Sequence, residues 1–112
     1  SMLRDINASY MKYGEAIKKR RMARGVSLRK FAVECGITPT TLSALENDKY
    51  LPSRETLTRI AEQLGVAPVI LILDAITLED IPEEKRKDYM TLEKPLKEFI
   101  NGRNSQTDDE KM

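Results

Sequence analysis

Apolar residues recur between residues 12 and 74 with the spacing of short amphipathic helices. Leu28, Phe31, Ala32 and Cys35 fall at positions i, i+3, i+4 and i+7, and the same template recurs from Leu57 to Leu64. Single glycines and capping residues separate the apolar segments at intervals of about 8–12 residues, which is short helix length. The pattern predicts five helices, over about 12–24, 28–35, 39–47, 54–64 and 68–74.

The run "PVILIL" at 68–73 is apolar throughout, so its periodicity fits a strand or a buried helix. Pro68 favours a helix, because proline is well placed in a first helical turn. The predicted fold is therefore all-α, a five-helix domain followed by a short helical C-terminal extension. The predicted core consists of Ile17, Val26, Leu28, Phe31, Ala32, Ile37, Leu42, Leu45, Leu57, Ile60, Ala61, Leu64, Val66, Ile70 and Leu71.

The pattern changes after residue 74. Pro82 is placed to begin a helix whose first turn carries Glu83 and Glu84, and Pro95 is expected to break or restart that helix. One face of it would carry Tyr89, Leu92, Leu96, Phe99 and Ile100. The predicted organisation is an N-terminal tail at 1–11, a domain at 12–74, a helical extension at 75–101 and a disordered tail at 102–112.

The composition excludes the common metal sites, catalytic pairs and phosphate-binding loops. The 112 residues include no histidine and one cysteine, Cys35, which rules out the usual zinc ligand sets and the Ser–His and Cys–His nucleophile pairs. The five glycines are scattered, so no phosphate-binding loop is present. We expect no enzyme activity, no cofactor and no metal. Cys35 suits the core of a cytoplasmic protein, with redox sensing as the alternative.

No apolar run has the length needed to span a bilayer, and the first 30 residues show no signal-peptide core, so no membrane partner is expected. The charge is unevenly divided. Residues 1–73 hold 12 Lys and Arg against 7 Asp and Glu, whereas residues 74–112 hold 7 against 11. A basic front half favours a polyanion partner, although solvated helix faces would give the same count.

The stretch "SLRKFAVECGITPTTLSALENDKYLPSRETLTRIAEQLGV" resembles the Cro and phage-repressor (XRE-like) type of helix-turn-helix DNA-binding domain, and the resemblance extends from about Gly14 to Leu73. It depends on the pair Phe31–Ala32, the turn Gly36–Ile37, the sequence Leu-Glu-Asn at 45–47, and Leu-Gly-Val at 64–66. The resemblance implies that the helix at 39–47 enters the major groove of double-stranded DNA.

Once Leu42 and Leu45 are assigned to the core, small residues remain on the outer side of this helix. The resemblance maps base reading onto Pro39, Thr40, Ser43 and Ala44, and Thr41 belongs to the same small, hydroxyl-rich set. The family often carries Gln or Arg at these positions, and this chain has neither. Specificity is then expected to depend on water-mediated contacts and DNA shape.

Four residues are predicted to contact phosphate. Arg29 and Lys30 lie in the first turn of the helix at 28–35, where cations are unfavourable unless an external anion compensates. By resemblance, Asn47 and Lys49 belong to a backbone-contacting loop. The resemblance also implies a structural ion pair between Arg21 and Glu46, in which a bidentate carboxylate fixes the angle between two helices.

The sequence favours a sequence-specific DNA-binding transcriptional regulator, a repressor that binds operator DNA as a homodimer. Residues 75–101 could dimerise, could bind a protein partner as in an antitoxin, or could fold back on the domain. A third interpretation is a domain that no longer selects sequence and bridges other factors.

Overall fold

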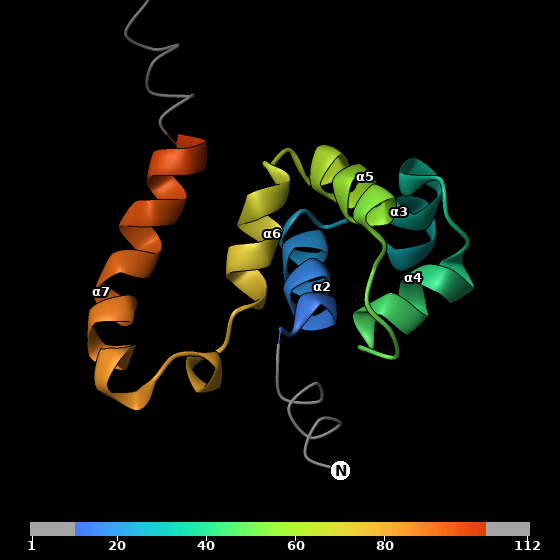
Figure 1. Cartoon of the computed structure of the whole chain (residues 1–112). Coiled ribbons are helices and arrows are strands. Elements are labelled where there is room, and N and C mark those ends of the chain that lie inside the picture. The colour runs from blue at the N-terminus through green and yellow to red at the C-terminus, as the bar shows by residue number, and fades with distance from the viewer. Residues whose placement is uncertain (1–10, 103–112) are drawn as a thin grey trace, which may run out of the picture.

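The computed structural model describes residues 11–102, and this range contains only helices and the turns that connect them (Figure 1). The predicted all-α class is confirmed. The tails predicted at 1–11 and 102–112 lie outside the described residues except for Met11 and Gly102. The α-helices are α2 (Tyr13–Ala23), α3 (Leu28–Cys35), α4 (Pro39–Glu46), α5 (Arg54–Leu64), α6 (Pro68–Ala75) and α7 (Arg86–Lys97).

Side-chain caps explain where three helices begin. The hydroxyls of Ser27, Thr38 and Ser53 accept hydrogen bonds from backbone N–H groups in the first turns of α3, α4 and α5. α3 ends at Gly36, whose φ of 73° lies in the left-handed region that favours glycine. Local signals therefore set the short helices of the helix-turn-helix, and packing holds them.

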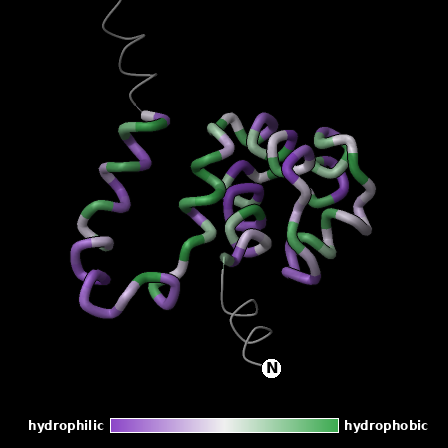
Figure 2. The backbone as a smooth tube through the Cα atoms, in the orientation of Figure 1, coloured by the Kyte–Doolittle hydropathy of each residue, from purple (hydrophilic) through white to green (hydrophobic). Residues whose placement is uncertain are grey.

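The core lies between α2, α3, α4, α5 and α6. Every residue of the predicted core is buried or half-buried, and Ala16, Cys35 and Ala75 are buried with them. The apolar run at 68–73 forms α6 with Pro68 in its first turn, so the helix prediction is confirmed over the strand. Figure 2 shows hydrophobic positions following one another along α6.

α2 and the C-terminal end of α4 approach each other closely at Gly14. A Cβ atom on Gly14 would lie 2.3 Å from the carbonyl oxygen of Leu45 and 2.7 Å from that of Glu46. The Gly14 N–H donates to Oδ1 of Asp48 at 2.8 Å. This contact fixes the exit of α4 against the start of α2, and with it the orientation of α4.

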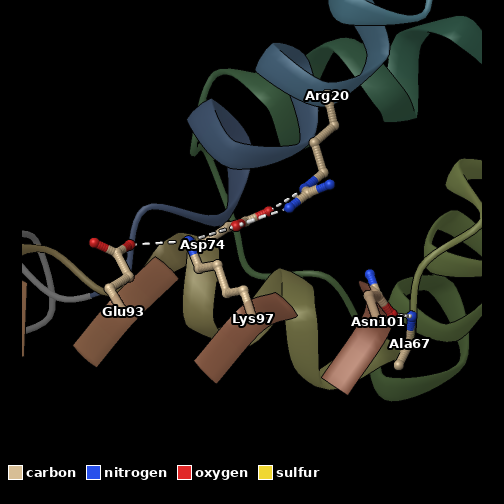
Figure 3. Close-up of polar contacts among 6 residues, drawn as sticks. All are labelled: Arg20, Ala67, Asp74, Glu93, Lys97 and Asn101. Atoms are coloured by element: carbon tan, nitrogen blue, oxygen red, sulfur yellow. Dashed lines mark hydrogen bonds and ion pairs between the residues drawn. The ribbon is translucent and has the colours of Figure 1, made fainter. Parts of the chain in front are cut away.

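α7 lies beside α6 on the side away from α3, α4 and α5 (Figure 1). Two short 3₁₀ turns, η1 (Leu78–Asp80) and η2 (Glu83–Lys85), lead to it. Figure 3 shows its attachment: Arg20 and Lys97 both pair with the carboxylate of Asp74, and Lys97 also pairs with Glu93 at 2.9 Å. The side chain of Asn101 accepts a hydrogen bond from the Ala67 N–H at 3.3 Å.

The expectation for Pro82 was confirmed: Pro82 caps the 3₁₀ turn η2, which carries Glu83 and Glu84 and continues directly into α7 at Arg86. The expectation for Pro95 was wrong. Pro95 does not break the helix but lies inside it, and α7 continues into a π-helical turn, η3 (Glu98–Gly102). Because Pro95 stands in the last turn of α7, its missing N–H removes one hydrogen bond, and the wider winding after it continues the helix.

Within residues 11–102, no single helix is long and apolar enough to cross a membrane. The helices α5 and α6 meet that criterion only as a pair, by length and composition, with a bend of 101° between them.

Candidate nucleic-acid interface

α4 is anchored by two leucines and presents its other side outward. Leu42 and Leu45 are 0% and 2% exposed, respectively. Thr40 is exposed, and Ser43 and Ala44 are half-buried. No other segment of residues 11–102 covers Thr40, so the hydroxyl-bearing side of the helix remains open.

The N-terminus of α4 is held by Thr38. Its Oγ1 accepts from the Thr41 N–H at 3.0 Å and donates its own proton to Oγ1 of Thr41 at 2.9 Å. Thr41 is half-buried and engaged in this cap. Two of the five residues predicted to read bases thus have local partners: Thr41 takes part in this cap, and the Ser43 hydroxyl accepts a hydrogen bond from the Asn47 amide at 3.4 Å.

The four other predicted reading residues meet at one surface hollow. Its volume is about 350 Å³, and its lining consists of Pro39, Thr40, Ser43, Ala44 and Lys49. Hydroxyls, methyl groups and one cation thus face the same space. Such a surface offers hydrogen-bond donors and acceptors and small apolar contacts to base edges, with a positive charge beside them.

The predicted phosphate-contacting residues occupy two places. Arg29 and Lys30 are exposed in the first turn of α3, and Asn47 and Lys49 are exposed after α4. Only Lys49 lines the hollow. The Asn47 amide donates to the carbonyl oxygen of Ser43 at 2.8 Å and so closes the last turn of α4.

The arginines of the basic stretch have different surroundings. Arg20 pairs with Asp74, and Arg24 donates to the carbonyl oxygen of Gln63. Arg29, Lys30 and Lys49, in contrast, form no ion pair with any described residue. Their charges remain available to an external anion.

Arg21 and Glu46 form the bidentate pair that the sequence pointed to. Nε of Arg21 lies 2.7 Å from Oε2 of Glu46, and Nη2 lies 3.0 Å from Oε1. The side chains are 10% and 3% exposed. The hydrogen bond to Glu46 raises the pKa of Arg21 against the opposing effect of burial. Arg21 also donates from Nη1 to the Val26 carbonyl oxygen at 2.7 Å, so one side chain ties α2 to α4 and to the loop before α3.

Sequence reasoning missed Tyr50, which follows Lys49 in the turn after α4. Tyr50 is half exposed, at 50%, and the neighbouring Leu51 is more exposed still. A phenol hydroxyl beside Lys49 is a type of group that contacts DNA phosphates. The signal in the sequence was an aromatic residue directly after the cation of this loop.

The family model described as helix-turn-helix matches residues 17–71. These residues are a helix-turn-helix domain of the Cro and phage-repressor type. The match begins inside α2 and ends inside α6, so it contains the whole hollow on α4 and leaves α7 outside.

Two proteins illustrate the likeness. Over 50 residues the chain is 42% identical to the ImmF control region 10 kDa protein of Bacillus phage phi105. The aligned residues make up 45% of this chain and 56% of that protein. Among solved structures, the clp gene regulator ClgR from Corynebacterium glutamicum aligns with a TM-score of 0.56 and 29% identity, over 58% of this chain and 69% of that one. The first name refers to a phage control region and the second to a gene regulator.

Proposed function

We propose that the chain is a sequence-specific repressor that binds operator DNA as a homodimer, with α4 in the major groove. The observation that carries this proposal is the hollow on α4, where Thr40, Ser43 and Lys49 face outward together. In helix-turn-helix domains the N-terminal residues of the second helix contact base edges. Two copies related by a two-fold axis would read two half-sites.

In this proposal, hydroxyl and methyl groups of small side chains discriminate between DNA sequences. Thr40 and Ser43 supply hydroxyls, and the methyl groups of Thr40 and Ala44 fit against thymine methyl groups. No Gln or Arg lies on α4 to form a bidentate contact with a base. We therefore expect moderate sequence preference, to which ordered water and the shape of the duplex contribute.

The test is selection of duplexes from a randomised pool, followed by fluorescence anisotropy on the selected sequence. Thr40→Glu places a carboxylate in the hollow, and it should weaken binding more than about thirtyfold through repulsion from phosphate. An acidic residue is favourable in the first turn of a helix, so this variant should stay folded. Thr58→Glu, at an exposed threonine of α5, is the matched control and should change affinity less than about threefold.

Two further variants separate reading from anchoring. Ser43→Ala should change which sequences are selected, whereas Lys49→Ala should weaken binding to all duplexes and reduce the salt slope by about one. A flat selection profile for the unmodified chain would contradict sequence-specific binding. It would instead support a domain that bridges other factors.

One observation supports a second candidate function. α7 and η3 carry exposed apolar residues, including Phe99 of η3 at 68% exposure, and both elements lie outside the helix-turn-helix domain. An antitoxin would use such a helix to bind its toxin while the domain regulates the operon. Co-purification of a defined toxin encoded beside this gene, lost on Phe99→Glu, would favour that function.

A further inference from the structure

Within residues 11–102, one largely apolar face of α7 and of the following turn η3 is exposed. Leu92 and Leu96 of α7 and Phe99 of η3 follow at spacings of four and three, so they form one stripe along this helical segment. They are 61%, 42% and 68% exposed, respectively. Thr91 and Pro95 border the stripe and are exposed as well. We call these five residues the Leu92 face.

The Leu92 face is not the side that attaches α7 to its own domain. Lys97 pairs with Asp74 of α6 and with Glu93 of its own helix, and Asn101 contacts Ala67. Tyr89 and Ile100 are half-buried, whereas the sequence had grouped them with the stripe. The structure therefore divides the predicted surface into an attached side and a free side.

We propose that the Leu92 face binds the Leu92 face of a second copy, with the two α7 helices antiparallel. This inference rests on the proposed function, in which two copies read two half-sites. The face carries no charge, so two identical copies meet without repulsion between like charges. Thr91 and Pro95 at its border are uncharged and exposed as well.

Asp88 favours the antiparallel over the parallel orientation of the two α7 helices. It is the charged residue of α7 that stands on the same side as the Leu92 face, one helical turn before Leu92. A parallel pair would place the two Asp88 carboxylates side by side, which is unfavourable. An antiparallel pair centred near Leu96 puts them at opposite ends of the contact.

The expected interface is small. α7 and η3 together span residues 86–102, a rod of roughly 25 Å at 1.5 Å per residue. Two such rods packed side by side bury an area at the low end of the range for specific protein–protein interfaces, at or below about 1,200 Å² in total. Self-association should therefore be weak in free protein and should strengthen on a duplex with two half-sites, because the second contact becomes intramolecular.

Two matched substitutions test the surface. Leu92 and Met90 are 61% and 62% exposed on the same helix, and two residues apart they point to nearly opposite sides. We expect Leu92→Glu to weaken self-association by more than about tenfold, because it buries an unpaired carboxylate, and Met90→Glu to leave it within about twofold. Sedimentation equilibrium over about 1–200 µM measures both, and circular dichroism verifies that both variants are folded.

Cysteine substitutions test the direction. Leu96→Cys should form a disulfide-linked dimer under mild oxidation, because its Cβ atoms would approach the distance of about 4 Å that a disulfide requires. Asp88→Cys should not, and the buried Cys35 does not compete. Equal cross-linking of both variants would overturn the antiparallel arrangement.

The dimer inference and the proposed function fail in different ways. A chain that is monomeric at all concentrations, or a Leu92→Glu variant that dimerises like the unmodified chain, overturns the Leu92 interface. If such a chain still selects a sequence from the randomised pool, the DNA-binding proposal stands. A chain that dimerises as expected and selects nothing overturns DNA reading alone.

Discussion

Removal of the Glu46 carboxylate is the sharpest test of how the fold holds α4 in place. Glu46 lies at the end of α4 with a side chain only 3% exposed, and it accepts two hydrogen bonds from Arg21 of α2. Glu46→Ala leaves the guanidinium in the same buried position without its anion. The variant therefore tests a contact that sets the angle between α2 and α4.

The expected cost follows from the contacts that are lost. A hydrogen bond to a charged group contributes about 1.5–3 kcal/mol, so two of them give about 3–6 kcal/mol. Arg21 keeps its hydrogen bond to the Val26 carbonyl oxygen, and its side chain is 10% exposed, which lets water replace part of the lost interaction. We therefore expect a loss of about 2–4 kcal/mol in the free energy of unfolding. For a domain of this size the melting temperature should fall by on the order of 10–25 °C.

Urea unfolding followed by circular dichroism is the assay, since the chain has no tryptophan. Glu55→Ala is the control: it removes an ion pair with Arg59 whose side chains are 73% and 48% exposed, and should cost less than about 1 kcal/mol. Adding Arg21→Met to Glu46→Ala should restore part of the stability, because the unpaired cation is gone. An unchanged urea midpoint for Glu46→Ala would refute the reasoning.

Three further outcomes are expected from buried or attached groups. Gly14→Ala should lower the free energy of unfolding by about 2 kcal/mol or more, because the added Cβ would lie 2.3 Å from a backbone oxygen. Gly102→Ala is the control: its Cβ would have its nearest neighbour at 3.7 Å, so it should be nearly neutral in the same urea experiment. Asp74→Asn should release α7 and speed limited proteolysis between residues 76 and 85. Burial alone would raise the pKa of Asp74, but hydrogen bonds from Arg20 and Lys97 outweigh it and lower that pKa. The attachment of α7 should therefore be constant from about pH 5 to 9 and lost as the pH falls below the ordinary carboxyl value of 3.8. A transition near neutral pH would contradict this. Burial, with a smaller contribution from the charge of Glu34, raises the pKa of Cys35 to about 11, so a thiol reagent at pH 7 should label it rapidly only in denaturant, and rapid labelling of the native chain would revive the redox interpretation.

The helices and their core could be predicted because the signals for them are local. Thr38 and Pro39 begin α4 within one turn, and Gly36 ends α3 through its own backbone conformation. The apolar period then fixes which side of each helix is buried. The resemblance added what local signals lack, namely the pairing of Arg21 with Glu46 across two helices.

Contacts between distant residues that no motif marks were not predicted. Gly14 stood inside a predicted helix, which is a known sign of close packing, but nothing in the sequence named Leu45 as its neighbour. Likewise, Asp74 ends an apolar run, and only the fold brings it between Arg20 and Lys97. The position of α7 therefore depended on an ion network that spans three helices.

The sequence also does not show which cations are paired within the protein, and these pairs change the salt dependence expected for DNA binding. The sequence counts eight cations between residues 12 and 30 as equivalent, although Arg20, Arg21 and Arg24 are bound to groups of the protein itself. If all eight neutralised phosphates, the slope of log affinity against log salt would be about −7 per domain. If the contacts are those of Arg29, Lys30 and Lys49, which form no ion pair within residues 11–102, the slope is about −3. The cations are thus divided into two groups: Arg20 and Arg21 of α2 hold the domain together, while Arg29, Lys30 and Lys49 stay available to an external anion.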